Sequence, residues 1–166
     1  MIQKTEGARS LTLEFITGSQ LNCRLHFTSL FIRTGNRMTL IISSVIFAAL
    51  LIIISKLPVA ISMGKQTGGY DNRHPRKQQA NLTNFGQRAL GAHINSIEAF
   101  PIFATGVCLA LISQANIVTV QNLCVIFSCA RIAYLICYWF DIDKVRSIIW
   151  TIGFGACIWL MALALL

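Results

Sequence analysis

Four long apolar runs constrain this chain more than any other feature of its sequence. They lie at about residues 39–63, 86–112, 117–139 and 146–166, and each can cross the hydrocarbon core of a bilayer as a helix. Helices are favoured in lipid because every backbone polar group must find its partner within the segment. Hydrophobic residues make up 55% of the chain and charged residues only 12%, about half the charged fraction of a soluble domain. We therefore predict an all-α, polytopic membrane protein with a bundle of four transmembrane helices.

The first 37 residues differ from the rest of the chain. They mix charged residues with short apolar clusters and show neither the continuous apolar core nor the small-residue cleavage site of a signal peptide. Two interpretations stay open: a poorly ordered or locally helical tail, or an extension that precedes a true translation start at Met38. We favour the second and assign residues 38–166 to the four-helix membrane domain.

The polar loop at residues 64–85 carries the strongest topological signal. Against Asp71 it holds four basic residues, a net charge of +3 (4 − 1): Lys65, Arg73, Arg76 and Lys77. Loops rich in Lys and Arg remain on the cytoplasmic side, and four spans place loop 140–145 on the same side. We therefore expect both loops to be cytoplasmic. The formal net charge of +8 follows this spacing between apolar runs, so it does not indicate a nucleic-acid partner.

Cysteine and histidine residues do not indicate a metal site. The six cysteines form no CxxC pair, and five of them lie inside the apolar runs. Cysteines in such positions are interpreted as small hydrophobic residues rather than disulfides. No second His or Cys lies at metal-ligand spacing from His93.

A stripe of polar residues interrupts the start of the second span. Arg88, Asn95 and Glu98 recur at one- and two-turn spacing, which places them along one face of a helix. Ionisable groups near or inside a bilayer are expensive and normally face a partner or a wet cavity. Asn95 and Glu98 lie deeper than snorkelling explains, so the stripe predicts a buried polar site.

Further polar residues of the third and fourth spans are expected at the same end of the bundle. Arg131, Tyr134 and Tyr138 share one face of the third span, and Arg146 with Ser147 opens the fourth. This convergence favours a ligand site, although each tyrosine could also belong to an interfacial aromatic belt.

A structural alternative accounts for the same charges without a ligand. In it Glu98 pairs with Arg131 or Arg88 and locks the helices together. The ligand site and the structural lock both stay open at this point.

The order of these residues resembles that of a known family. The positions that carry the resemblance in the second span are Arg88-Ala89, Ala92-His93, Asn95, Glu98 and Phe100-Pro101. Those in the third and fourth spans are Arg131, Tyr134, Tyr138 and Arg146-Ser147. Over about residues 38–166 the chain resembles the MAPEG family, the membrane-associated proteins of eicosanoid and glutathione metabolism. The segment DNRHPRKQQANLTNFGQRA is similar to the linker of a bacterial branch of that family.

The resemblance implies a homotrimer in a lipid bilayer, here a bacterial inner membrane, with glutathione bound as co-substrate between subunits at the cytosolic side. It also implies roles for individual residues. Asn95 and Glu98 would hold the backbone and amino groups of glutathione, and Tyr138 would bind it with Tyr134 lining the cleft. Arg146 would stabilise the thiolate, next to Ser147.

One position departs from the eukaryotic pattern of that family. Gly91 stands where eukaryotic members carry an arginine, and Arg88 resembles the bacterial pattern instead. Arg88, like Arg131, is assigned to glutathione binding.

We therefore predict a membrane-bound, glutathione-dependent enzyme, transferase-like or peroxidase-like, acting on lipophilic electrophiles that enter from the bilayer. The chemistry is consistent with the residues, because arginines bind carboxylates and a nearby cation favours the reactive thiolate over the thiol. The alternative is a non-enzymatic oligomeric membrane protein of the same fold, in which Arg–Glu pairs are structural locks. Gly91 is the residue that motivates this alternative.

Overall fold

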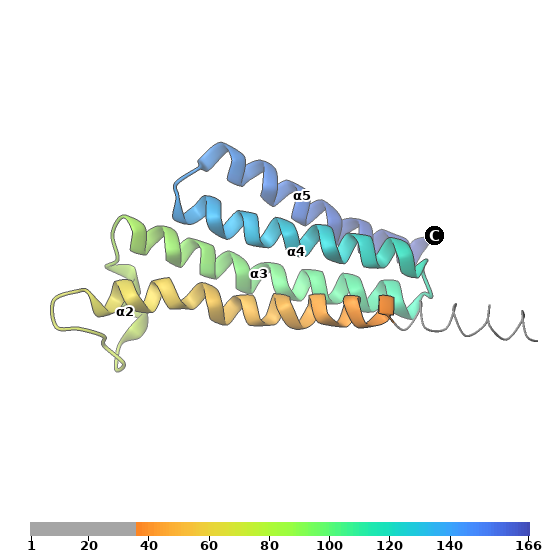
Figure 1. Cartoon of the computed structure of the whole chain (residues 1–166). Coiled ribbons are helices and arrows are strands. Elements are labelled where there is room, and N and C mark those ends of the chain that lie inside the picture. The colour runs from red at the N-terminus through yellow and green to blue at the C-terminus, as the bar shows by residue number, and fades with distance from the viewer. Residues whose placement is uncertain (1–35) are drawn as a thin grey trace, which may run out of the picture. The chain divides into compact units, whose positions relative to one another are not determined.

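Four long helices make up almost the whole of the described chain. The structure is a computed structural model that describes residues 36–166. The first helix is Asn36–Gly64, and it is followed by the short α2 (Pro75–Ala80), α3 (Phe85–Ile112), α4 (Ile117–Trp139) and α5 (Asp143–Ala162), with a 3₁₀ turn at Leu163–Leu165 (Figure 1). The first helix, α3, α4 and α5 are each long and apolar enough to cross a membrane, and residues 36–166 contain no strand. The predicted all-α four-helix membrane bundle is confirmed.

The predicted N-terminal extension, residues 1–37, lies outside the described residues except for its last two, which begin the first helix. Its interpretation stays a prediction. Residues 39–166 form one compact unit.

A short polar turn joins α3 to α4, and its last residue fixes where α4 begins. Asn116 caps α4, because its Oδ1 accepts from the backbone N–H groups of Val118 and Thr119 at 3.0 and 3.3 Å. The fourth span begins at Asp143, three residues before the predicted Arg146 (146 − 143). The predicted loop 140–145 is therefore shorter. An acidic residue in the first turn favours this earlier start through its interaction with the helix dipole.

Three clusters of buried side chains hold the helices together. In the largest, the rings of Phe103 on α3 and Phe127 on α4 stack with centroids 3.9 Å apart. Gly106 lets α3 approach α5, since a Cβ at this position would lie 3.1 Å from the Cys157 carbonyl oxygen. Small residues permit such close contact between transmembrane helices.

The first helix packs on α3 through apolar and polar contacts. Val59 and Met63 are fully buried in a cluster that also contains Ala89. One polar contact joins the same two helices, between the hydroxyl of Ser55 and Nδ1 of His93 at 3.0 Å. His93 therefore takes part in helix packing.

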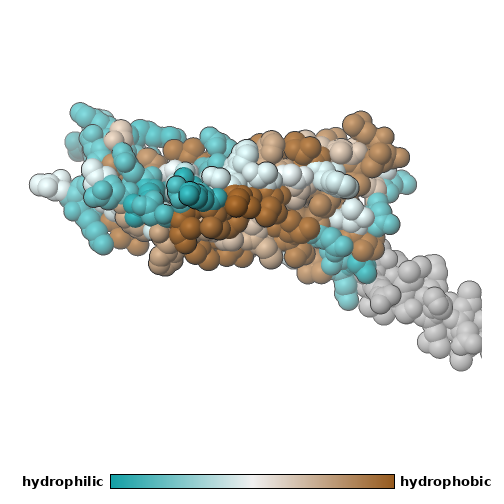
Figure 2. Space-filling model, turned by 90° about the horizontal axis from the view of Figure 1, so that it is seen from above, coloured by the Kyte–Doolittle hydropathy of each residue, from teal (hydrophilic) through white to brown (hydrophobic). Residues whose placement is uncertain are grey.

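Polar residues gather at one end of the bundle. Figure 2 shows hydrophilic residues concentrated at the end that carries α2, and hydrophobic residues along the body on the visible face. The exposed large side chains of the four long helices are mostly aliphatic or aromatic, as expected for surfaces in contact with lipid. The chain is thus a multi-pass membrane protein with one distinctly polar end.

Gln78 and Asp71 make several of the hydrogen bonds that order the loop before α3. Gln78 Nε2 donates to the carbonyl oxygens of Met63 and Gly69 at 3.1 and 2.7 Å, and its Oε1 accepts from the N–H of Asp71. The Asp71 carboxylate accepts from the backbone N–H groups of His74 and Arg73, and these bonds hold the pKa of Asp71 below its usual value of 3.8.

Candidate functional site

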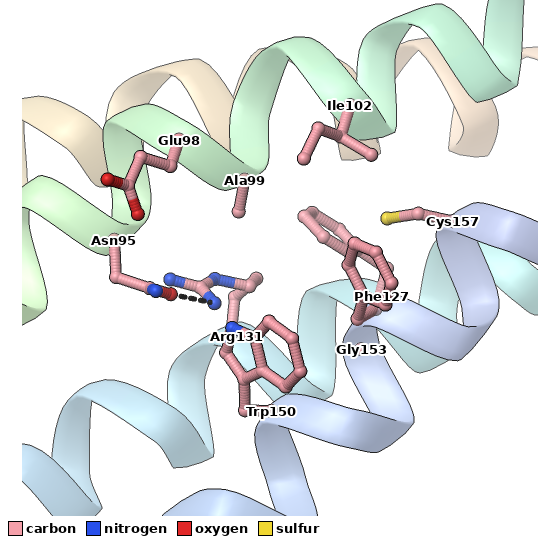
Figure 3. Close-up of a pocket in the computed structure, with 10 residues that line it drawn as sticks. Asn95, Glu98, Ala99, Ile102, Phe127, Arg131, Trp150, Gly153 and Cys157 are labelled. Carbon is pink, nitrogen blue, oxygen red and sulfur yellow. Dashed lines mark hydrogen bonds between the residues drawn. The ribbon is translucent and has the colours of Figure 1, made fainter.

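A buried arginine lies between α3 and α4. The side chain of Arg131 is only 4% exposed, and its Nη1 donates to Oδ1 of Asn95 at 2.9 Å (Figure 3). Its Cζ lies 4.6 Å from the centre of the Tyr134 ring, within the range of a cation–π contact. Its Nη2 has no hydrogen-bond partner among residues 36–166. The structure thus brings Arg131 and Asn95 into direct contact.

A small cavity surrounds this arginine. It measures about 100 Å³ and lies between α3, α4 and α5. The residues that line it are Asn95, Glu98, Ala99, Ile102, Phe127, Arg131, Trp150, Gly153, Phe154 and Cys157. Most of these side chains are apolar, so the guanidinium, the amide and the Glu98 carboxylate are its main polar groups.

A second, more open groove lies between α4 and α5. It measures about 320 Å³ and is lined by Tyr134, Tyr138, Arg146, Ser147, Trp150 and Thr151. The guanidinium carbon of Arg146 lies 4.3 Å from the centre of the Tyr138 ring. That ring meets Tyr134 edge-on, with centroids 5.2 Å apart. Four of the predicted site residues therefore share one groove, with a cation held on an aromatic surface.

One tryptophan borders both spaces. Trp150 lines the cavity and the groove, and its ring stacks on Phe154 with centroids 5.0 Å apart. Trp150 lies one turn after Arg146 on α5, so it falls on the same face. The spacing of four residues from Arg146 is a signal that the sequence contains, but Trp150 was not among the predicted site residues.

The arginine–glutamate locks of the structural alternative are not formed within the described chain. Arg131 contacts Asn95 instead, and Nη1 of Arg88 lies 3.4 Å from Oδ2 of Asp141. Glu98 is exposed and forms no ion pair with any residue of 36–166. Within residues 36–166, the structural alternative therefore lacks the pair of Glu98 with Arg131 or Arg88 on which it depends. Asn95 is half-buried beside the guanidinium, whereas Glu98 is exposed.

Gly91 is explained by the packing of Tyr138. A Cβ built on Gly91 would lie 2.9 Å from the Tyr138 hydroxyl oxygen, 3.0 Å from Cε1 and 3.2 Å from Cζ. A larger residue at this position would therefore press on the ring that carries Arg146. Gly91 therefore leaves room for the Tyr138 ring in the groove, which explains structurally why a residue without a side chain stands here.

The described part of the chain was also compared with the requirements of a metal site. Residues 36–166 contain no group of three or more His, Cys, Asp or Glu side chains placed to hold a metal ion.

Comparison with known proteins gives one match. The model of the MAPEG family matches residues 40–166, which covers the four helices and most of the chain. No curated protein and no solved structure matches the chain. The match extends over the residues from which the resemblance was drawn, from the second span to Arg146. With a four-helix membrane fold and a family match over most of its length, the chain belongs to the MAPEG family of membrane proteins, which is associated with glutathione.

Proposed function

We propose that this protein is a membrane-bound, glutathione-dependent enzyme that acts on lipophilic electrophiles as a transferase or peroxidase. The observation that carries the proposal is the groove in which Arg146 lies over the Tyr138 ring, beside Ser147. Its volume of about 320 Å³ falls at the lower end of the range for small-molecule sites.

The residues of the groove would have different roles toward glutathione. The guanidinium of Arg146 would stabilise the thiolate, because a fixed cation in a poorly solvated site favours the charged form of the sulfur. Tyr134, Tyr138 and Ser147 would bind the peptide through their hydroxyl groups. Arg88, Asn95, Glu98 and Arg131 would complete the site from α3 and α4, with a neighbouring subunit of a homotrimer covering the groove.

Orientation in the membrane follows from charge. The loop before α3 carries Lys65, Arg73, Arg76 and Lys77, all of them exposed. Loops of this kind remain in the cytoplasm, so the polar end of the bundle would face the cytoplasm of a bacterial inner membrane. Glutathione, a cytoplasmic peptide, would then reach the groove from water.

The test is formation of the thiolate. Glutathione is added to the purified protein in detergent, and its thiolate is followed by ultraviolet absorbance. We expect a signal from the wild type and from Arg73→Ala, an exposed-loop control, and little or none from Arg146→Ala. Absence of a signal from the wild type would overturn the proposal.

The non-enzymatic alternative makes a different prediction. A scaffold without a ligand site should not be stabilised by glutathione, whereas an enzyme that binds it should gain about 2.7 kcal/mol at a hundredfold excess over Kd. A rise in melting temperature with glutathione decides against the scaffold.

A further inference from the structure

A cluster of basic side chains lies between the first helix, α2 and α3, apart from both the cavity and the groove. Ser55 on the first helix contacts His93 on α3 at 3.0 Å, so the next residue, Lys56, lies beside this contact. Arg76 of α2 is close enough for its guanidinium and the Lys56 ammonium to repel each other, and both charges act on the His93 ring. Figure 1 shows the first helix lying along α3, with α2 at the end where both reach the loop.

No acidic side chain neutralises this cluster within residues 36–166. Lys56 and Arg76 form no salt bridge with any residue of that range. Its acidic residues lie elsewhere: Asp71 beside His74, Asp141 beside Arg88, Asp143 at the start of α5, and Glu98 at the cavity. Like charges without a counter-charge disfavour each other. An anion between Lys56 and Arg76 would remove this repulsion, so the cluster favours an anionic ligand.

His93 positions the cluster and offers no donor to an anion in its neutral form. The hydroxyl of Ser55 donates its one hydrogen to the Ile52 carbonyl oxygen at 2.9 Å. In the contact with His93 the hydroxyl therefore accepts, and Nδ1 carries the hydrogen. The second nitrogen of a neutral ring is then an acceptor. Lys56 and Arg76 are thus the donors that an anion would meet.

The depth of Lys56 corresponds to the lipid phosphates. The first helix has 29 residues, about 43 Å at 1.5 Å per residue, which equals the thickness of a bilayer with its headgroups. Lys56 lies eight residues before the helix ends at Gly64 (64 − 56), about 12 Å from that end. Its Cα is then about 5 Å inside the hydrocarbon core, from where a lysine extends its ammonium to the interface.

An exposed aliphatic stripe of the first helix begins next to Lys56. Its members recur at intervals of three and four residues and so share one face: Ile46, Leu50, Ile53 and Leu57. From Ile46 to Leu57 the stripe extends 11 residues (57 − 46), about 16 Å, close to the hydrocarbon thickness of one leaflet, about 15 Å. A lipid with its phosphate at Lys56 would place its acyl chains along this stripe.

We propose that Lys56 and Arg76 bind the phosphodiester of an anionic glycerophospholipid whose acyl chains lie along the aliphatic stripe. The headgroup should have a net negative charge, because Lys65, Arg73 and Lys77 make the adjoining loop basic and would repel a headgroup ammonium. Phosphatidylglycerol has this chemistry. Its binding would join the first helix to α2, and it does not depend on the proposed enzymatic function.

Binding is measured by native mass spectrometry of the full chain in its own assembly, in a non-ionic detergent. The protein is titrated with phosphatidylglycerol or with phosphatidylcholine of the same acyl chains. Lys56→Met removes the ammonium and keeps an apolar stem of similar length, and Arg76→Gln removes the guanidinium. Each has a control with the same change in net charge at an exposed position: Lys144→Met on α5, and Arg73→Gln in the same loop as Arg76.

We expect phosphatidylglycerol to bind the wild type about tenfold more tightly than phosphatidylcholine does, at one molecule per chain. Lys56→Met and Arg76→Gln should each weaken it about fivefold, the equivalent of about 1 kcal/mol for one basic residue near anionic lipid. Both controls should leave it almost unchanged, because salt screens exposed charges. Equal affinities for the two lipids, or equal effects of site and control variants, would overturn the site.

Thermal unfolding shows whether a variant has lost binding through misfolding. Without lipid, Lys56→Met should melt at the wild-type temperature or above it, since it removes a repulsive, half-buried charge. With phosphatidylglycerol the wild type should gain more than the variant. A lower melting temperature of Lys56→Met without lipid would refute the repulsion on which the site rests.

Competition identifies the source of the phosphate. Neither glycerophosphate, which has no acyl chains, nor glutathione should displace the lipid from the wild type. Displacement by glycerophosphate would overturn the lipid in favour of a soluble phosphate, and displacement by glutathione would assign Lys56 to the glutathione site instead. Absence of any stabilisation by glutathione, with lipid binding intact, counts against the proposed function alone.

Discussion

Replacing Gly91 by alanine tests the packing of the groove most directly. The added Cβ would lie 2.9 Å from the Tyr138 hydroxyl oxygen and 3.0 Å from Cε1, where carbon atoms normally sit about 3.5–4.0 Å apart. The ring would have to shift by several tenths of an ångström. It cannot do so freely, because Arg146 lies over its face and Tyr134 meets it edge-on.

Two opposing contributions set the magnitude. Overpacking costs about 1–3 kcal/mol, whereas alanine stabilises a helix interior by about 1 kcal/mol relative to glycine. Gly155 on α5 is the matched control, since a Cβ there meets nothing within 4 Å. Gly155→Ala should therefore stabilise the protein by about 1 kcal/mol, and Gly91→Ala should be less stable than this control by about 1–3 kcal/mol.

The assay is the free energy of unfolding, measured by titration with a denaturing detergent. Adding Tyr138→Leu removes the three atoms that the new Cβ would approach, so the double variant should recover most of the loss, as contacting residues couple by about 0.5–3 kcal/mol. If Gly91→Ala stabilises the protein as much as Gly155→Ala does, the packing argument is wrong. Equal losses with and without Tyr138→Leu would also refute it.

Three further contacts give separate predictions. Ser55→Ala removes the hydrogen bond to His93 and should lower the free energy of unfolding by about 1 kcal/mol; no change would show that this contact is not maintained. The pKa of Asp71 in the folded protein lies below 3.8, so the Asp71 carboxylate stabilises the loop fully well above that pH and loses this effect as the pH falls through the folded pKa. The protection of the loop amides from hydrogen exchange should show this dependence on pH in the wild type and should not show it in Asp71→Asn. Arg88→Ala should lower the free energy of unfolding by less than about 1 kcal/mol, because the Asp141 side chain of its ion pair is 64% exposed and solvent screens the pair, and a larger, salt-independent loss would contradict this.

Hydropathy was sufficient to predict the fold, because a segment that crosses lipid must satisfy its own backbone hydrogen bonds and therefore forms a helix. Each long apolar run became a helix, and the spans at 86–112 and 117–139 agree with α3 and α4 to within one residue. The fourth helix begins earlier than predicted, at Asp143, because this acidic residue interacts favourably with the helix dipole in the first turn. Hydropathy does not include this interaction, so it locates the helix but misplaces its first residue.

Helical periodicity predicted which residues share a face, but it did not predict which partners they choose. Asn95 and Glu98 were both candidates for the face that meets Arg131, and only the amide of Asn95 contacts it. The choice depends on how α3 crosses α4, which is a property of two helices. The same limit applies to Asp141, whose place opposite Arg88 is set by a turn with φ of 62°.

One site residue was missed because it has an ordinary role in membranes, and another was noticed for a different reason. Trp150 has the position of an interfacial tryptophan, whereas Gly91 was noticed only as a departure from a family pattern. The structure gives both a local role, since Trp150 lines both the cavity and the groove, and Gly91 leaves room for the Tyr138 ring. Such roles depend on the surrounding residues, whose positions the sequence pattern does not predict.

Glu98 places a limit on how copies of this chain can assemble. It lies at position 14 of the 28 residues of α3, about 20 Å along the helix axis at 1.5 Å per residue, and it is exposed in the single chain. An acidic side chain facing lipid at the middle of a membrane helix costs about 2.5–3.5 kcal/mol or more. The face of α3 that carries Glu98 should therefore be covered by a polar ligand, by water or by a second copy. An arrangement of subunits that turned Glu98 toward lipid would carry this cost in every subunit, whereas the proposed trimer with glutathione between its subunits would avoid it.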